Sequence, residues 1–151
     1  MENRSHADAA AELAELKNLE MAGFVEAAKD PLWVWPVIGL FAGLFLASFE
    51  INSTLVSVMA SIGYVLGIGV LVALVVRRRG VQPRMNNMPA PLKRIFAIYT
   101  LGVFVVVGTI LGIGFGVSFV YAGIVAFLLI TAGGIWYHQH WRSAVTAMVT
   151  S

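Results

Sequence analysis

The chain contains no cysteine, and its charged residues are few and unevenly placed. The absence of cysteine excludes disulfides, thiolate chemistry, zinc–thiolate sites and iron–sulfur clusters. Charged residues make up 12% of the 151 residues, whereas about 25% is usual in soluble domains. So few polar groups do not cover a soluble domain, and 59% hydrophobic residues is too much for a disordered chain. With a mean hydropathy of +0.84, the composition predicts an integral membrane protein.

Charge is almost missing from two long stretches of the chain. Residues 31–76 carry one charged residue, Glu50, and residues 95–141 carry none. A membrane-spanning helix needs about 20 apolar residues, each with a rise of about 1.5 Å. The second stretch is expected to turn near 114–118, because as one helix it would extend roughly 65 Å, twice the hydrocarbon thickness. The sequence therefore predicts four spans, at about 32–49, 55–76, 95–114 and 119–137.

The segments outside these spans complete the expected organisation. The acidic tail, residues 1–30, is rich in Ala, Leu and Glu, which favour a helix. The basic loop, residues 77–94, contains three prolines and is expected not to be crossed by a helix. A C-terminal tail, 142–151, follows the membrane domain, 31–141. We therefore predict an all-α integral membrane protein, a four-transmembrane-helix bundle with an N-terminal cytoplasmic helix.

The basic residues predict how this bundle is oriented. With four spans, both tails and the basic loop share one side of the membrane, and they hold all ten Lys and Arg residues. Because cytoplasmic loops are enriched in Lys and Arg, both termini are predicted to be cytoplasmic. Tryptophan rings prefer the membrane interface. All four tryptophans fall at the same ends of the first and last spans: Trp33, Trp35, Trp136 and Trp141.

The helix expected in the acidic tail carries only a thin apolar stripe. Its net negative charge opposes docking on an anionic membrane surface. Three interpretations remain open for this helix. It is a solvated helix, it pairs with the basic loop of the same chain, or it contacts a partner protein.

Small residues recur at every fourth position in three of the expected spans. Because lipid gives helices no hydrophobic drive to associate, stripes of this kind are typical of close helix contacts. The first interpretation is packing inside one bundle. The second is that the stripe at 108, 112 and 116 faces a second copy or another membrane protein. The candidate packing glycines are Gly39, Gly43, Gly63, Gly67, Gly108, Gly112 and Gly116.

Ionisable side chains are absent from the middle of every expected span. Proton-coupled transporters, pumps and voltage sensors keep such groups there. No constellation supplies a catalytic, metal or cofactor site, so we expect neither an enzyme nor a cofactor. Hydroxyls near mid-span usually bond a carbonyl of their own helix or reach a neighbouring helix. These hydroxyls belong to Ser57, Ser61, Tyr64, Thr100, Thr109 and Thr131.

Glu50 is a candidate for binding, whereas two histidines are not expected to form a metal site. Glu50 is the only acid beyond the N-terminal tail and lies at the outer end of the first expected span. It is either an interfacial carboxylate that caps the next helix or a ligand or ion site at the outer mouth of a pathway. His138 and His140 are two positions apart, so on a helix they point about 200° from each other and share no metal ion.

Six basic residues and no acidic residue lie between the second and third expected spans. A stop-transfer and topology signal is the first interpretation. Binding of anionic lipid is the second, because roughly 4–8 clustered bases at a helix end are typical of it. Nucleic acid is not an expected partner. The six residues are Arg77, Arg78, Arg79, Arg84, Lys93 and Arg94.

The first part of the chain has a distinctive order of motifs. An acidic Ala/Leu helix precedes Asp30-Pro-Leu-Trp-Val-Trp-Pro-Val-Ile-Gly39, and two spans then end at Arg77-Arg-Arg-Gly80. This order resembles small multi-pass membrane proteins of high-GC Gram-positive bacteria. The resemblance covers residues 1–80 and implies a bacterial plasma membrane and no activity.

These features favour a non-enzymatic accessory, regulatory or interaction subunit. It would assemble through its glycine-rich helix faces, as a homo-oligomer or with a membrane-protein partner, and would contact the bilayer and its anionic lipids. The alternative is a small homo-oligomeric transporter or channel with Glu50 near its outer mouth.

Overall fold

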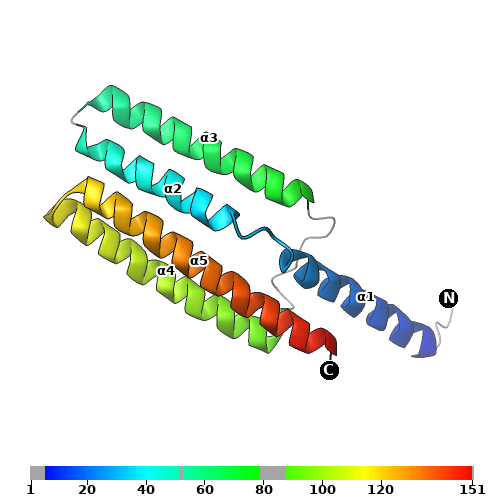
Figure 1. Cartoon of the computed structure of the whole chain (residues 1–151). Helices are drawn as coiled ribbons and strands as arrows, with labels where there is room; N and C mark the ends of the chain where they lie inside the picture. The colour runs from blue at the N-terminus through cyan, green and yellow to red at the C-terminus, as the bar shows by residue number, and fades with distance from the viewer. Residues whose placement is uncertain (1–5, 52, 79–87, 151) are drawn as a thin grey trace.

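The computed structural model describes residues 6–51, 53–78 and 88–150. All regular elements in these ranges are helical, which confirms the all-helical prediction (Figure 1). The α-helices are α1 (His6–Ala27), α2 (Val34–Ala47), α3 (Thr54–Arg78), α4 (Ala90–Gly116) and α5 (Phe119–Thr150), and a short 3-10 helix, η1 (Ser48–Glu50), continues α2.

Three of these helices are long and apolar enough to cross a membrane, namely α3, α4 and α5. The fourth apolar segment, Val34–Glu50, combines α2 and η1 and is shorter. The apolar character follows directly from the uncharged runs of the sequence. The chain is thus an all-helical protein with the features of a small membrane protein.

The apolar helices lie side by side in the order α3, α2, α5, α4, which we call the helix row (Figure 1). The most extensive contact joins α2 to α5, and α5 also packs along α4. α3 packs against α2 and η1. In the described part of the chain, extensive contact between α3 and α4 is lacking. The row is therefore open, with α3 and α4 as its two edges.

The centre of the row depends on glycines at which the backbones of α2 and α5 meet. A Cβ atom added at Gly43 would lie 2.8 Å from the Gly123 carbonyl oxygen. A Cβ atom at Gly39 would lie 2.9 Å from the Phe127 carbonyl oxygen. Close approach of this kind gives packing energy where lipid supplies no hydrophobic drive. Next to this contact, Ile110, Ala122 and Ala126 form a small buried cluster between α4 and α5.

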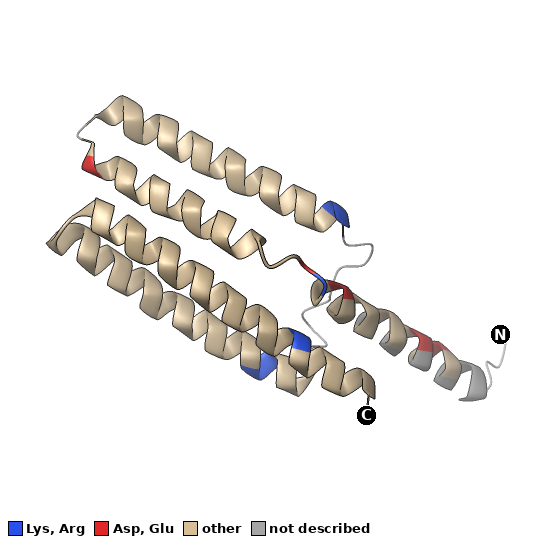
Figure 2. Ribbon diagram, viewed as in Figure 1, with Lys and Arg blue, Asp and Glu red and all other residues tan. Residues whose placement is uncertain are grey.

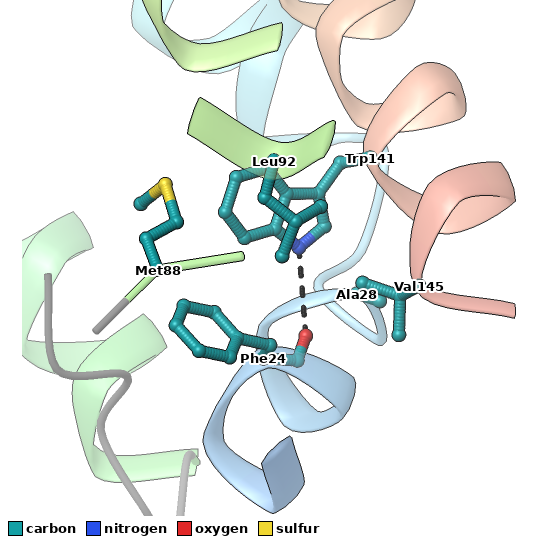
Figure 3. Close-up of a cluster of buried hydrophobic side chains, with 6 residues drawn as sticks. All are labelled: Phe24, Ala28, Met88, Leu92, Trp141 and Val145. Atoms are coloured by element: carbon teal, nitrogen blue, oxygen red, sulfur yellow. Dashed lines mark hydrogen bonds between the residues drawn. The ribbon is translucent and has the colours of Figure 1, made fainter. Parts of the chain in front are cut away.

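The C-terminal end of α1 is anchored to the row, while the rest of α1 extends away from it (Figure 1). Phe24 is only 1% exposed and packs against Trp141, whose indole Nε1 donates a hydrogen bond of 3.4 Å to the Phe24 carbonyl oxygen. Figure 3 shows the side chains of one buried cluster, which come from the C-terminal end of α1 and the residue after it, from the start of α4 and the segment just before it, and from α5. The cluster contains Phe24, Ala28, Met88, Leu92, Trp141 and Val145.

Two boundaries differ from the sequence-based expectation. α4 begins at Ala90, inside the expected loop. Pro91 is tolerated in its first turn, because N–H groups there have no carbonyl partner within the helix, so the N–H that proline lacks is not needed. α5 continues to Thr150 through the expected C-terminal tail, and Trp141 and Val145 on this extension are buried against α1 and α4. Tertiary packing thus extends α5 beyond the end that its apolar pattern alone predicts.

Candidate functional site

The structure divides the seven candidate glycines into two groups. Gly39 and Gly43 lie at the α2–α5 contact, and Gly67 faces the ring of Phe41, whose Cε1 would lie 2.6 Å from an added Cβ. These three glycines are used for packing within the chain. The other four have no neighbouring heavy atom within 4 Å of an added Cβ: Gly63, Gly108, Gly112 and Gly116.

Two further glycines contribute to the contact, and the sequence analysis did not single them out. Gly123 meets the backbone of Gly43, and a Cβ at Gly134 would overlap the ring of Trp35. The signal that identifies Gly123 is its position among Ala122 and Ala126, a small-residue face of α5 that is fully buried. Gly134 has no comparable signal, because its role depends on where the Trp35 ring lies.

The open glycines of α4 form one stripe on an edge of the helix row. Gly108, Gly112 and Gly116 follow one another at every fourth position and so share a helix face. Large apolar side chains elsewhere on α4 are strongly exposed, with Phe104 at 71% and Phe115 at 80%. This edge thus offers an exposed, apolar surface with open space over its glycines.

Glu50 caps a helix. The hydroxyl of Ser118 donates to Glu50 Oε2 at 3.0 Å, and the backbone N–H of Phe119 donates to the same oxygen at 2.8 Å. Phe119 is the first residue of α5, so the carboxylate satisfies a free N–H group and faces the positive end of the helix dipole. The capping interpretation therefore describes the contacts of Glu50, although the capped helix is α5 rather than α3.

Two of the hydroxyl groups singled out in the sequence bond to their own helices. Ser61 donates to the Ser57 carbonyl oxygen at 2.8 Å, and Thr109 donates to the Val105 carbonyl oxygen at 2.9 Å. Thr131 is different, because its buried Oγ1 has no hydrogen-bond partner in the described part of the chain. The donor protons of Ser61 and Thr109 are thus used within their own helices.

The two histidines of α5 lie in different surroundings. His138 is 5% exposed, and its Nε2 has no hydrogen-bond partner among the described residues. His140 is exposed, its ring lies 4.3 Å from the Trp136 ring, and its Nδ1 lies 2.9 Å from the Trp136 carbonyl oxygen. The two side chains diverge as their spacing predicts. Over residues 6–51, 53–78 and 88–150, no group of three or more metal-ligating side chains gathers.

The described cations lie at one end of the helix row, the end at which α1 is docked (Figure 2). Arg77 and Arg78 end α3, and Lys93 and Arg94 lie near the start of α4. Figure 2 places these two pairs on opposite edges of the row rather than in one cluster. Arg79 and Arg84 lie outside the described residues.

An apolar groove of about 400 Å³ runs between α4 and α5. Ile98, Gly102 and Ile110 contribute from α4, and Gly133 and Trp136 contribute from α5. The sequence does not predict this groove, because it forms only when α4 and α5 pack so that Gly102 and Gly133 line the same gap. At one end it is bordered by Tyr99, whose ring lies 4.4 Å from that of Tyr137 and 6.1 Å from that of Trp35.

No protein-family model, curated protein or solved structure matches this chain.

The geometry offers surfaces for contact in two places. One is the open glycine stripe of α4, and the other is the apolar groove between α4 and α5. Both surfaces are apolar and face outward from the helix row, so they suit partners within the bilayer rather than soluble substrates.

Proposed function

We propose that the chain spans the membrane four times, with the segment Val34–Glu50 as the first span. Its length lies at the lower end of the range of about 17–25 residues that crosses a bilayer. The Phe24–Trp141 contact supports an even number of spans, because it brings the end of α1 to the end of α5. A chain that begins and ends on one side of a membrane must cross it an even number of times.

The side on which the termini lie is proposed from charge. All ten Lys and Arg residues are on the side of the termini in a four-span arrangement, and such residues are enriched in cytoplasmic segments. The resemblance of residues 1–80 to small bacterial membrane proteins supports the plasma membrane as the location. Both termini are then cytoplasmic.

We propose further that the protein is a non-enzymatic interaction subunit that assembles with a second copy of itself through α4. The observation that carries this proposal is the unfilled space over Gly108, Gly112 and Gly116. The glycines of α2 show what such a stripe does when it has a partner, since Gly43 brings two backbones into contact. α4 carries a stripe of the same kind on the edge of the row.

A second copy fits this edge because the stripe is complementary to itself. A two-fold axis beside α4 places each glycine opposite its counterpart, so one surface supplies both halves of the interface. Glycine spacing of this type lets two helices cross closely in membranes. The large side chains beside the stripe, such as Phe115, then flank the partner helix.

Disulfide cross-linking tests this assembly cleanly because the chain has no cysteine of its own. In membranes, the variant Gly112→Cys is expected to form a covalent dimer on mild oxidation. Leu128→Cys on α5, which is also exposed, is the matched control and is expected to remain monomeric. Adding Gly108→Leu should abolish the Gly112→Cys cross-link, because a bulky side chain separates the helices.

Native mass spectrometry of the protein in lipid nanodiscs gives a second measure. A dimer that Gly108→Leu converts to monomer supports the proposal. A different protein retained in fixed ratio, without any self-dimer, would contradict it. No specific observation favours the transporter alternative. Its candidate residue, Glu50, accepts hydrogen bonds from the start of α5.

A further inference from the structure

We propose that the groove between α4 and α5 holds one acyl chain of an anionic phospholipid, whose headgroup lies beside Arg94. This inference is independent of the self-assembly of α4, because Gly108, Gly112 and Gly116 do not line the groove. The volume of about 400 Å³ falls within the range of roughly 300–1,000 Å³ that is typical of small-molecule sites.

The groove exists because two side chains are missing from facing helices. An added Cβ at Gly102 of α4 or at Gly133 of α5 would meet no heavy atom within 4 Å. Toward the other end of the same helices, Ile110 packs with Ala122 and Ala126, and the gap closes. The groove is therefore open along one part of the α4–α5 contact and closed beyond it.

The shape of the groove fits a single hydrocarbon chain better than a helix. From Ile98 to Ile110 the groove follows α4 for about 18 Å. A polymethylene chain is one carbon atom wide, and carbon atoms touch at about 3.5–4.0 Å, so such a chain is narrow enough to lie along the groove. A helix with its side chains is about 10–12 Å across and is too wide.

The mouth of the groove has the features of a membrane interface. Trp136 lines this end and is 40% exposed. Tyr99 lines it as well and is held in place by its contacts with the rings of Trp35 and Tyr137. Aromatic rings with one polar atom prefer the level of the lipid headgroups. A chain that lies in the groove thus enters at the depth where its headgroup belongs.

Charge next to the mouth selects the headgroup. Arg94 is exposed and lies one helical turn before Ile98, which lines one edge of the groove. Lys93 is its neighbour, and His140 stacks on Trp136 one turn beyond the mouth. Residues 90–150 contain no Asp or Glu. A phosphate group at this level therefore meets cations of α4 and no carboxylate of α4 or α5, which favours an anionic phospholipid.

The experiment compares lipid retention in nanodiscs that contain phosphatidylglycerol or phosphatidylcholine. Native mass spectrometry of the full chain is expected to retain phosphatidylglycerol preferentially. Gly102→Leu and Gly133→Leu place side chains in the groove and should lower this retention to the level of phosphatidylcholine. Gly69→Leu on α3 is the matched control, because it also fills open space but lies away from the groove. It should retain phosphatidylglycerol as the unmodified protein does.

The headgroup is tested by Arg94→Gln, which leaves the groove unchanged. Loss of one cation near the surface should lower the preference for phosphatidylglycerol about fivefold. If phosphatidylglycerol and phosphatidylcholine are retained equally by the unmodified protein, or if Gly102→Leu and Gly133→Leu both retain lipid fully, the proposal is wrong.

Fluorescence gives a second readout, which detects lipid at the mouth of the groove. Phosphatidylglycerol with brominated acyl chains, present as a minor component in phosphatidylcholine, should quench tryptophan more strongly than brominated phosphatidylcholine at the same level. Trp136→Phe should remove the excess quenching, because Trp136 lines the mouth. Equal quenching by the two brominated lipids, or an excess that survives Trp136→Phe, would overturn the proposal.

Discussion

At the scale of single residues, the same residue type serves different roles according to what faces it. At Gly43 the backbone of α5 lies too close for any side chain, whereas a side chain at Gly112 would face open space. The sequence presents both as small residues at helical spacing and does not distinguish them. The difference lies in which helix face meets a neighbour, and that is decided by packing across long sequence separations.

Glu50 is the clearest case in which the structure narrows a choice that the sequence leaves open. Its carboxylate was predicted either to cap a helix or to form an outer binding site. Two hydrogen bonds from Ser118 and Phe119 are those of a cap. The partner helix was not predictable, because Ser118 is far along the chain from Glu50 and only the fold brings them together.

We expect Glu50→Gln to weaken this cap. The variant keeps an acceptor oxygen but loses the charge that faces the helix dipole, so the free energy of unfolding should fall by about 0.3–1 kcal/mol. Thermal unfolding in detergent, followed by circular dichroism, measures the change. Glu15→Gln on the exposed part of α1 is the control and should have little effect. Ion flux that depends on Glu50 at unchanged stability would contradict the capping role.

At the scale of elements, hydrophobic runs predicted which segments form helices but not where each helix ends. α4 starts earlier than expected because proline is compatible with a first turn. α5 extends further because Trp141 and Val145 find partners on α1 and α4. Pairing of α1 with the basic loop was one of three open interpretations. The observed contact includes Met88 and Leu92 of that loop, but it is apolar and extends to Trp141 of α5. It depends on Phe24, a residue in an acidic helix with only a weak apolar stripe.

α1 should be released when its anchor is removed. Phe24 is almost fully buried, and truncation of a buried Phe to Ala usually costs about 3–5 kcal/mol. We expect Phe24→Ala to detach α1 while α2 to α5 keep their contacts, because α1 touches only one end of the row. Limited proteolysis should then cut within α1 much faster than in the unmodified protein.

Leu16→Ala is the control for this prediction, because Leu16 also lies on α1 but is 54% exposed. Its rate of cleavage should match that of the unmodified protein. If Phe24→Ala leaves α1 as resistant as before, the cluster around Trp141 does not hold the helix in the membrane-bound protein.

At the scale of the whole molecule, the sequence predicted four apolar segments but not their order in space. The helices form an open row because α2 and α5 join at its centre through Gly39, Gly43 and Gly123. An open row leaves two edges and a groove exposed to lipid, which a closed bundle would bury. The surfaces available for assembly and lipid contact are thus a consequence of arrangement rather than of composition.

The number of spans and their orientation can be tested with single cysteines, because the chain has none. Leu13→Cys on α1, Ile51→Cys after η1 and Thr150→Cys on α5 are all exposed positions. In intact cells, a membrane-impermeant thiol reagent should label Ile51→Cys only. Leu13→Cys and Thr150→Cys should react after permeabilisation, because the proposed orientation places both termini in the cytoplasm. Labelling of Leu13→Cys without Thr150→Cys in intact cells would mean that α2 does not cross the membrane. The contact between Phe24 of α1 and Trp141 of α5 would then not form in the membrane.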